Sequence, residues 1–337
     1  MDARMYMDEA FDLSCVSTGH LPAAELVKTL LREGHERFKL VNEGKVADYI
    51  PALAKTPREL FGLCVAGVNG AVHAVGDMEY EFSIQSVSKP FVFALVCQAL
   101  GGEEVRRKIG VNSTGLPFDS VMAIELNTDR TMNPMVNAGA IATSSLAPGA
   151  TAEAKWQFIQ DGLSRFSGRK LTFNADVYES ESATNQRNQG VARLLESYGR
   201  IYCDPLEATE VYTKQCSLNV TVKDLAMMGA TLADGGVNPI TKERVIDADC
   251  CKRVLAVLAT AGLYEQSGDW LYETGLPGKS GVSGGIVTVS PGKGGMGTFA
   301  PLLDSAGNSI KGQLVTKFLS VRLGLNLFAS KPAESSK

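Results

Sequence analysis

The stretch EFSIQSVSKPFVFAL, residues 81–95, places a lysine and a proline between two apolar runs. Proline is tolerated in the first turn of a helix, where the amides lack an intrahelical acceptor, but in mid-helix it removes a hydrogen bond and clashes. Pro90 therefore predicts that a helix begins near Ser86. The continuation FVFALVCQAL is apolar on all sides, which predicts a buried helix that ends at Gly101 and Gly102.

Within this stretch Ser86 and Lys89 form a candidate pair of nucleophile and base. Ser86 would lie at the positive end of the helix dipole, and Lys89 would point to the same side about one turn away. A serine hydroxyl is a poor nucleophile until a neighbour takes its proton, and a lysine can do this once its pKa falls from about 10.4. Burial and a second nearby cation would both lower that pKa.

The S-x-x-K spacing alone is a weak signal, because it occurs three times in this chain. The copies at residues 167–170 and 290–293 lie in polar and glycine-rich turns, and we expect both to be solvated loops. A second motif favours the first copy, since Lys279-Ser280-Gly281 precedes a strand as K-[ST]-G does in penicilloyl-serine enzymes. Lys279 would supply the second cation, and the small residues after it would admit a substrate carbonyl to an oxyanion hole.

Strand patterns lie toward both ends of the chain, and helical patterns fill its middle. We expect a helix over residues 22–32, a hairpin over 61–75 that turns at Asn69-Gly70, and a short strand at 81–85. Later come a helix capped by Thr221 and Asp224, two strands within residues 285–301, and a closing helix over 310–319.

This order predicts an α+β fold with one central antiparallel sheet. Terminal helices would cover one face of the sheet, and the helical block would cover the other. We expect a single domain over residues 21–328, in which a helical subdomain of residues 101–236 is inserted into a sheet subdomain made of 21–100 and 237–328. The polar residues 329–337 are expected to be a disordered tail.

Composition excludes several classes of protein. The 337 residues are 45% apolar with a net charge of −4, which is typical of a large globular domain. No run approaches the roughly 18 apolar residues of a membrane helix, and the first residues do not resemble a signal peptide, so we expect a cytoplasmic protein with no membrane partner. Seven cysteines without C-x-x-C and three scattered histidines predict reduced thiols and no metal site.

Two sequence patterns suggest nucleotide binding, but neither has the context it needs. Gly278-Lys279-Ser280 looks like the end of a P-loop, yet Glu273 stands where the first glycine is required. Residues 292–297 spell G-x-G-x-x-G, but they join two strands and open no helix. The acidic balance and the lack of basic clusters mixed with aromatics also argue against nucleic acid as a partner.

Seven motifs in order resemble the glutaminase family: YIPALAK, GD followed by FSIQSVSK, NPMVNAGAI, SES before NQRN, VYTKQCSLNV, GLYEQSG and GLPGKSGVSGG. The resemblance covers residues 21–328 and implies the serine β-lactamase/transpeptidase-like fold. It implies hydrolysis of L-glutamine to L-glutamate and ammonia without a cofactor, through an acyl-enzyme on Ser86 with Lys89 as base and Tyr264 as a proton relay. It also implies a homodimer or a homotetramer.

The resemblance further implies a substrate pocket, whose residues are Tyr49, Ser86, Asn137, Glu181, Asn188, Tyr212, Tyr264 and Val282. Glu181 would pair with the α-ammonium of glutamine, and Tyr49 would close over the amino-acid head. The backbone amides of Ser86 and Val282 would hold the oxyanion. Taken singly, a tyrosine is more often a half-buried packing residue and an asparagine a loop or cap residue.

Two other interpretations use the same residues. A β-lactamase or a penicillin-binding peptidase would use the same serine and lysine, but S-D-N is replaced by Ser217-Leu218-Asn219 and no export signal is evident. A catalytically silent member of the fold would bind an amino acid without turning it over. The intact set of Ser86, Lys89, Tyr264 and Lys279 argues against the silent member, which would have no need of a base.

Overall fold

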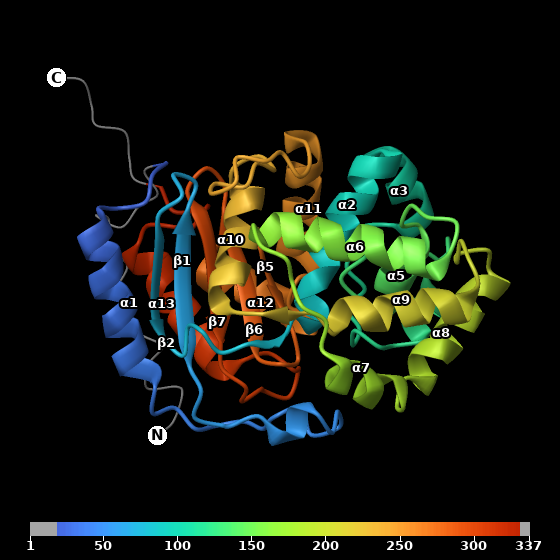
Figure 1. The fold of residues 1–337 in the computed structure, drawn as a ribbon, viewed down its shortest axis with the longest axis horizontal. Helices are drawn as coiled ribbons and strands as arrows, with labels where there is room; N and C mark the ends of the chain where they lie inside the picture. The colour runs from blue at the N-terminus through green and yellow to red at the C-terminus, as the bar shows by residue number, and fades with distance from the viewer. Residues whose placement is uncertain (1–18, 331–337) are drawn as a thin grey trace.

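A five-stranded antiparallel sheet joins the two ends of the chain (Figure 1). In this computed structural model, which describes residues 19–330, the strand order is β2-β1-β7-β6-β5. The strands are β1 (Gly62–Gly67), β2 (Val72–Gly76), β5 (Gly278–Ser280), β6 (Gly285–Ser290) and β7 (Gly294–Phe299). β1 pairs with β7, so the prediction of one antiparallel sheet built from both ends is confirmed.

Side chains that alternate along β1 feed two hydrophobic cores, one on each face of the sheet. Leu63 and Val65 pack with α1 (Ala24–Phe38) and α13 (Ile310–Arg322), whereas Cys64 and Ala66 belong to the core that includes Leu225 of α10 (Val222–Ala233). Successive side chains of a strand point to opposite faces. The two terminal helices therefore cover one face of the sheet and α10 covers the other (Figure 1), as the sequence predicts.

Glycines let α10 lie directly on the backbone of β7. A Cβ added to Gly295 would lie 2.3 Å from the carbonyl oxygen of Ala226, and one on Gly297 would lie 2.3 Å from that of Val222. Any side chain at either position would push the helix away from the sheet. Gly295 and Gly297, within the G-x-G-x-x-G stretch, therefore form a helix-packing surface in a β-hairpin.

Most of the remaining helices form a second layer beside the sheet (Figure 1). They are α2 (Lys89–Leu100), α3 (Gly102–Ile109), α4 (Met122–Leu126), α5 (Asn137–Ser145), α6 (Ala152–Ser167), α7 (Ala175–Ser182), α8 (Gln186–Ser197), α9 (Pro205–Cys216) and α11 (Ala248–Ala261). In contrast, α12 (Ser267–Thr274) packs against α13 and against Ile286 of β6. One hydrophobic core runs from α2 through α5, α6 and α9 to α10 and the sheet. The division into subdomains at residues 101 and 236 stays a prediction, and α10, which it assigns to the helical block, packs on the sheet.

Residues 81–95 fold largely as Pro90 predicts. A 3-10 turn, η4 (Gln85–Ser88), leads into α2 with Pro90 in the first helical turn, and Gly101 ends the helix with a φ of +89°. The strand expected at 81–85 is shorter, because the chain turns into η4. Only β3 (Phe82–Ser83) forms, and it pairs with β4 (Asn219–Val220) outside the central sheet.

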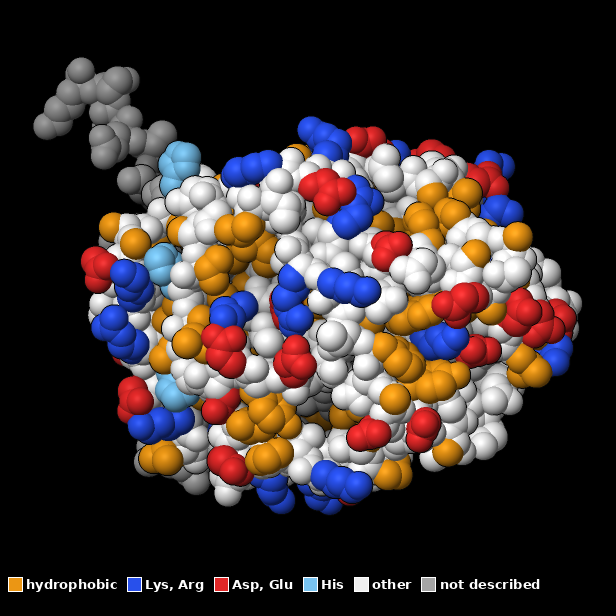
Figure 2. All heavy atoms as spheres, viewed as in Figure 1, with side chains coloured by type: hydrophobic (Ala, Val, Ile, Leu, Met, Phe, Trp, Pro, Cys, Tyr) orange, Lys and Arg blue, Asp and Glu red, His pale blue; other side chains and the backbone are white. Residues whose placement is uncertain are grey.

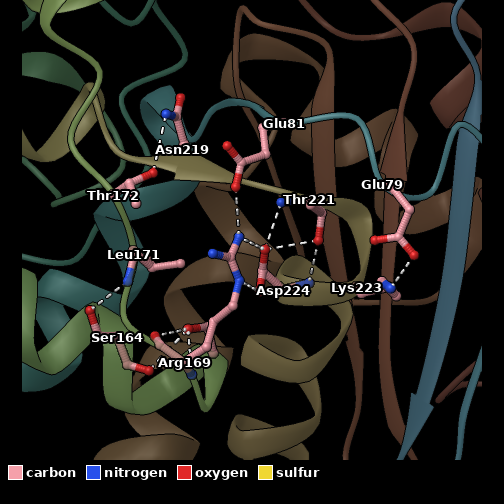
Figure 3. A network of polar contacts seen from close by, with 11 residues as sticks. Glu79, Glu81, Ser164, Arg169, Leu171, Thr172, Asn219, Thr221, Lys223 and Asp224 are labelled. Carbon is pink, nitrogen blue, oxygen red and sulfur yellow. Dashed lines mark hydrogen bonds and ion pairs between the residues drawn. The ribbon is translucent and has the colours of Figure 1, made fainter.

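Neither of the other two S-x-x-K copies is wholly the solvated loop that the sequence predicts, although Lys170 is exposed. Ser167 is buried, and Arg169 donates two hydrogen bonds to the carboxylate of Asp224 on α10 (Figure 3). Lys293 is 3% exposed, and its Nζ donates to the carbonyl oxygen of Gly324 at 2.7 Å, just beyond the end of α13. Carbonyls at the end of a helix need donors, which explains why a lysine is buried in a hairpin turn.

The surface bears charges of both signs. On the face shown in Figure 2, Lys and Arg side chains are interspersed with Asp and Glu side chains. Among the helices formed by residues 19–330, none combines the length and apolar character needed to cross a bilayer. Most of the tail predicted at 329–337, and the first residues used to exclude a signal peptide, lie outside the described part of the chain.

Candidate active site

Ser86 lies in the short 3-10 turn that connects β3 to α2. Gln85, the residue before it, has a φ of +50°, a left-handed conformation that is uncommon for any residue other than glycine. Side-chain contacts hold this turn. The hydroxyl of Ser88 donates to the carbonyl oxygen of Gln85 at 2.7 Å, and Nε2 of Gln85 donates to Glu181 at 2.5 Å and to Ser83 at 3.1 Å. The backbone around Ser86 is therefore fixed from both sides.

Lys89 is 1% exposed, and its amine is held by neutral oxygens. Nζ donates to Oδ1 of Asn137 at 2.8 Å and to the carbonyl oxygen of Met135 at 3.3 Å. The hydroxyl of Tyr212 donates to the same Oδ1 at 3.2 Å. Burial lowers the pKa of Lys89 to about 8, because the charged form loses its hydration without gaining a carboxylate. A substantial fraction of Lys89 is therefore neutral near pH 8 and able to accept a proton.

Lys279 is completely buried on β5, at the edge of the sheet. Its Nζ donates to the carbonyl oxygen of Ser280 at 2.7 Å and lies 4.1 Å from the centre of the Tyr264 ring. Burial, and then the charge of Lys89, hold the pKa of Lys279 well below its usual range. The sequence predicts that Lys279 lowers the pKa of Lys89. Burial is the first cause at both lysines, and the positive charges of the two amines also repel each other.

Tyr264 begins a second 3-10 turn, η5 (Tyr264–Gln266), with a φ of +55°. Its hydroxyl donates to the carbonyl oxygen of Ser280 at 3.4 Å and is hydrogen-bonded to the side chain of Ser86. Burial raises the pKa of Tyr264 to about 12, and hydrogen bonds with the side chains of Ser86 and Ser280 oppose the rise. The phenol therefore keeps its proton at physiological pH and stands beside Ser86 as a potential acid.

The residues expected to bind substrate gather around one cavity of about 130 Å³. Those that line it are Tyr49, Ser86, Asn137, Glu181, Asn188, Tyr212 and Val282, while Tyr264 lies behind the wall that they form. Six lining residues were not predicted as site residues: Ile50, Gln85, Phe118, Thr184, Asn185 and Cys216. Gln85 could have been suspected as the neighbour of Ser86, and Cys216 lies one helical turn after Tyr212.

A carboxylate and two amides give this cavity its polarity. Burial raises the pKa of Glu181 to about 7, and the hydrogen bond from Gln85 opposes that rise. Nδ2 of Asn137 donates to Oδ1 of Asn188 at 3.1 Å, which links α5 to α8. A partly desolvated carboxylate is a strong partner for an ammonium group. The cavity is therefore suited to a small molecule that carries one.

The small cavity opens into a larger one of about 790 Å³. Tyr49, Asn137, Asn188 and Val282 line both, and residues 44–49 and 303–307 form the outer walls. Tyr49 is 58% exposed at this mouth, where a side chain could close over a bound molecule. Among residues 19–330, His, Cys, Asp and Glu side chains form no group of three or more that could hold a metal ion.

Comparisons with known proteins agree on one family. The family model described as Glutaminase matches residues 44–328. Glutaminase 2 of Yersinia pestis is 63% identical over 317 residues, which cover 94% of this chain and 93% of that protein. The glutaminase of Colwellia psychrerythraea is 48% identical over 91% of this chain and 99% of its own length.

Solved structures give the same result. A probable glutaminase, ybaS, superposes with a TM-score of 0.90 at 43% identity and covers 92% of this chain and 100% of its own. The Bacillus subtilis glutaminase YbgJ superposes with a TM-score of 0.82 at 32% identity, covering 90% and 100%. That structure is a covalent complex with 5-oxo-L-norleucine, formed by reaction with 6-diazo-5-oxo-L-norleucine.

Proposed function

Since the chain belongs to the glutaminase family, amidohydrolases of the serine β-lactamase-like fold, we propose that it hydrolyses L-glutamine through an acyl-enzyme on Ser86. The products are L-glutamate and ammonia. The observation that carries the proposal is that Ser86 is hydrogen-bonded to Tyr264, with the buried amines of Lys279 and Lys89 close by, at a cavity lined by Ser86 and Glu181.

Acylation begins when the hydroxyl oxygen of Ser86 attacks the γ-carboxamide carbon of glutamine. Neutral Lys89 accepts the hydroxyl proton, which its pKa of about 8 allows. The backbone amides of Ser86 and Val282 stabilise the negative oxygen of the tetrahedral intermediate. Removing one donor of such an oxyanion hole typically costs about 10² to 10³ in rate.

Tyr264 then acts as the acid. It gives its proton to the leaving nitrogen as the carbon–nitrogen bond breaks, and it recovers a proton from Lys89 as ammonia departs. The raised pKa of Tyr264 supports this direction, because a phenol that stays protonated can donate. In the second half a water molecule attacks the ester carbon and gives a proton to Tyr264, whose own proton passes to Lys89. Lys89 then returns a proton to the departing oxygen of Ser86 as glutamate is released. Lys279 supports this proton transfer by holding the ring of Tyr264, since its Nζ lies 4.1 Å from the centre of that ring.

Substrate is selected by its amino-acid head. Glu181 binds the α-ammonium group, and the α-carboxylate meets neutral donors from Asn137, Asn188 and the hydroxyls of Tyr49 and Tyr212. A cavity of about 130 Å³ supports a ligand of the size of glutamine. Sites that hydrogen-bond polar groups of a substrate reject analogues that lack them strongly. The reaction needs no metal or organic cofactor, so dialysis against a chelator is expected to leave activity unchanged.

Purified wild-type protein and Ser86→Ala provide the test. At millimolar L-glutamine the wild type is expected to release ammonia, and the variant is expected to lose at least about 10³-fold in kcat. A wild type that releases none refutes the function, and an active Ser86→Ala refutes the nucleophile. A parallel panel of L-asparagine, D-glutamine and a chromogenic β-lactam distinguishes a glutaminase from a penicilloyl-serine enzyme. Calorimetric binding of glutamine without turnover would identify a silent binding protein.

We also infer that the enzyme works in the cytoplasm as a homodimer or homotetramer. The described cysteines are free, which supports a reducing compartment. Met122 and Leu126 of α4 are 56% and 70% exposed, which supports contact with another copy. Light scattering on the purified protein tests the oligomer, and cell fractionation tests the location.

A further inference from the structure

The carbonyl oxygen of Ser280 accepts hydrogen bonds from two groups of the proposed catalytic cluster. Nζ of Lys279 lies 2.7 Å from it, and the hydroxyl of Tyr264 lies 3.4 Å from it. Ser280 is the last residue of β5, the strand at the sheet edge that contacts η4. The direction of this one carbonyl therefore influences where the lysine amine and the tyrosine hydroxyl point.

The buried amide of Asn308 helps to hold this residue, together with the pairing of β5 with β6 and the hydrogen bond from the N–H of Gly281 to the carbonyl oxygen of Gly285. The hydroxyl of Ser280 donates to Oδ1 of Asn308 at 2.6 Å, and Nδ2 of Asn308 donates to Oε1 of Gln266 at 2.9 Å. Gln266 is the last residue of η5, the turn that begins with Tyr264. Asn308 and Ser280 are both fully buried. One side chain therefore connects the shared acceptor with the turn that carries the acid.

Asn308 is itself fixed by the loop from which it projects. Its backbone N–H donates to Oδ1 of Asp304 at 3.0 Å, and its carbonyl oxygen accepts from the N–H of Asp304 at 2.9 Å. The neighbouring residues 303–307 form a wall of the larger cavity, and a Cβ on Gly307 would lie 3.6 Å from Val282 and 3.9 Å from Tyr264. Asn308 lines neither cavity, so its effect must pass through Ser280 and Gln266.

We propose that Asn308 is a positioning residue, which holds Ser280 and Gln266 so that the Ser280 carbonyl and the Tyr264 hydroxyl keep their places beside Ser86. The inference rests on the proposed roles of Ser86 and Tyr264. Catalytic groups must be held within about 0.5 Å, and a misplacement of about 1 Å can cost 10²-fold in rate. Because Asn308 does not touch the substrate cavity, its loss lowers kcat and leaves KM for glutamine nearly unchanged.

The test compares Asn308→Ala with a matched control, Asn238→Ala. Asn238 is equally buried, and its side chain makes four hydrogen bonds, all with residues 165–166 and 240–241. It lines neither cavity. Both variants are expected to lower the melting temperature. Measured well below that temperature on folded protein, Asn308→Ala is expected to lose about 10- to 100-fold in kcat with KM within about twofold. Asn238→Ala is expected to keep kcat within about twofold.

Two variants of Ser280 add a comparison of kcat values that a loss of stability alone would not explain. Ser280→Ala is expected to lose kcat as Asn308→Ala does, and the double variant is expected to lose no more than either single one, because both break the same link. Ser280→Thr keeps the hydroxyl and is expected to recover most of the rate. The positioning role would be overturned by a wild-type kcat in Asn308→Ala, by an equal loss in Asn238→Ala, or by additive losses in the double variant. In each of these cases, ammonia release by the wild-type protein would still support the proposed function. A wild type that releases no ammonia would remove both proposals.

Discussion

At the scale of single residues, the charge state of Lys89 governs the proposed chemistry. Its pKa of about 8 means that the amine is mainly protonated below that pH and mainly neutral above it. We predict that kcat rises with pH through about 8 and then levels off, since only the neutral amine can accept the proton of Ser86. Steady-state ammonia release between pH 6 and pH 10 measures this.

Lys89→Arg is the matched control for that profile. The guanidinium keeps the charge and cannot lose its proton in this range, so the variant is expected to fall by about 10² to 10⁴ in kcat at every pH. A wild-type profile that is flat across pH 8, or an arginine variant with an unaltered rise, would show that Lys89 is not the base.

The second prediction concerns Glu181. Burial strengthens the attraction between its carboxylate and an ammonium group, but burial also opposes the ionisation of that carboxyl group. With a pKa of about 7 it protonates as the pH falls through neutrality, and KM for glutamine is expected to increase below that pH. In the folded protein the pKa of Glu181 is raised above its usual value of 4.5. The contribution of Glu181 to the free energy of unfolding is therefore full below about pH 4.5 and is lost as the pH rises through about 7.

Glu181→Gln separates binding from stability. The neutral amide removes the cost of burying a charge, so at pH 8 the free energy of unfolding is expected to rise by about 1 to 3 kcal/mol while KM rises at least tenfold. Urea unfolding and steady-state kinetics on the same samples measure both. A variant that is less stable at pH 8 than the wild type would contradict the assigned cause of the shift.

Which site residues could be predicted from sequence depends on how local their roles are. Ser86 and Lys89 share one turn and could be proposed from spacing and proline alone, whereas Glu181 and Asn188 needed the family resemblance. The position of Gln85 beside Ser86 was a hint, but its contact with Glu181 and the role of Asn308 could not be predicted, because they depend on residues 96 and 28 positions away. A left-handed φ at Gln85 has no sequence signature outside glycine.

At the scale of elements, the contact between α10 and β7 makes a stability prediction. Gly295→Ala would place a methyl group 2.3 Å from the backbone of Ala226 and Ala230, so the helix must move. We predict a loss of about 3 kcal/mol or more in the free energy of unfolding, from overpacking of a core without free space. The control is Gly190→Ala on α8, where no atom lies within 4 Å, and that change is expected to be neutral or stabilising.

The pair of Arg169 and Asp224 is the second element-scale contact (Figure 3). Arg169 donates at 2.7 Å and 2.6 Å to a carboxylate whose side chain is 7% exposed, and that carboxylate also accepts from the N–H and hydroxyl of Thr221 at the start of α10. Arg169→Ala is expected to lower the free energy of unfolding by about 1 to 3 kcal/mol, since it leaves a buried carboxylate short of a partner.

An exposed pair supplies the control for Arg169. Arg193 and Glu196 lie on α8 with side chains about half exposed, and breaking such a pair changes stability by about 0.5 kcal/mol or less. Equal effects of Arg169→Ala and Arg193→Ala in urea unfolding would show that the contact with Asp224 is not stabilising.

Elements with a local signal could be predicted, and those set by distant packing could not. Pro90 and the capping box at Thr221 fix helix starts that the structure confirms. The burial of Lys293 depends on α13 and the contact of Arg169 depends on α10, and both helices come later in the chain, so local polarity did not predict these contacts of the two discarded S-x-x-K copies.

At the scale of the whole molecule, the proposed site lies where the sheet meets the helical layer. Ser86 and Lys89 come from the start of α2, Val282 follows the edge strand β5, and Glu181 lies on α7. One hydrophobic core runs through both layers. We predict a single cooperative unfolding transition, in which tryptophan fluorescence and far-ultraviolet circular dichroism give the same midpoint. Two separated transitions would show that the layers are independent.

The central claim is that Ser86 forms the covalent bond with substrate, and a labelling experiment tests it most directly. The purified enzyme is incubated with 6-diazo-5-oxo-L-norleucine, digested, and mapped by mass spectrometry. We predict one 5-oxo-L-norleucyl group on the oxygen of Ser86 and a loss of ammonia release in proportion to labelling. L-glutamine is expected to protect Ser86 from the label. Label on another residue, or an enzyme that still hydrolyses glutamine after Ser86 is fully modified, would contradict it.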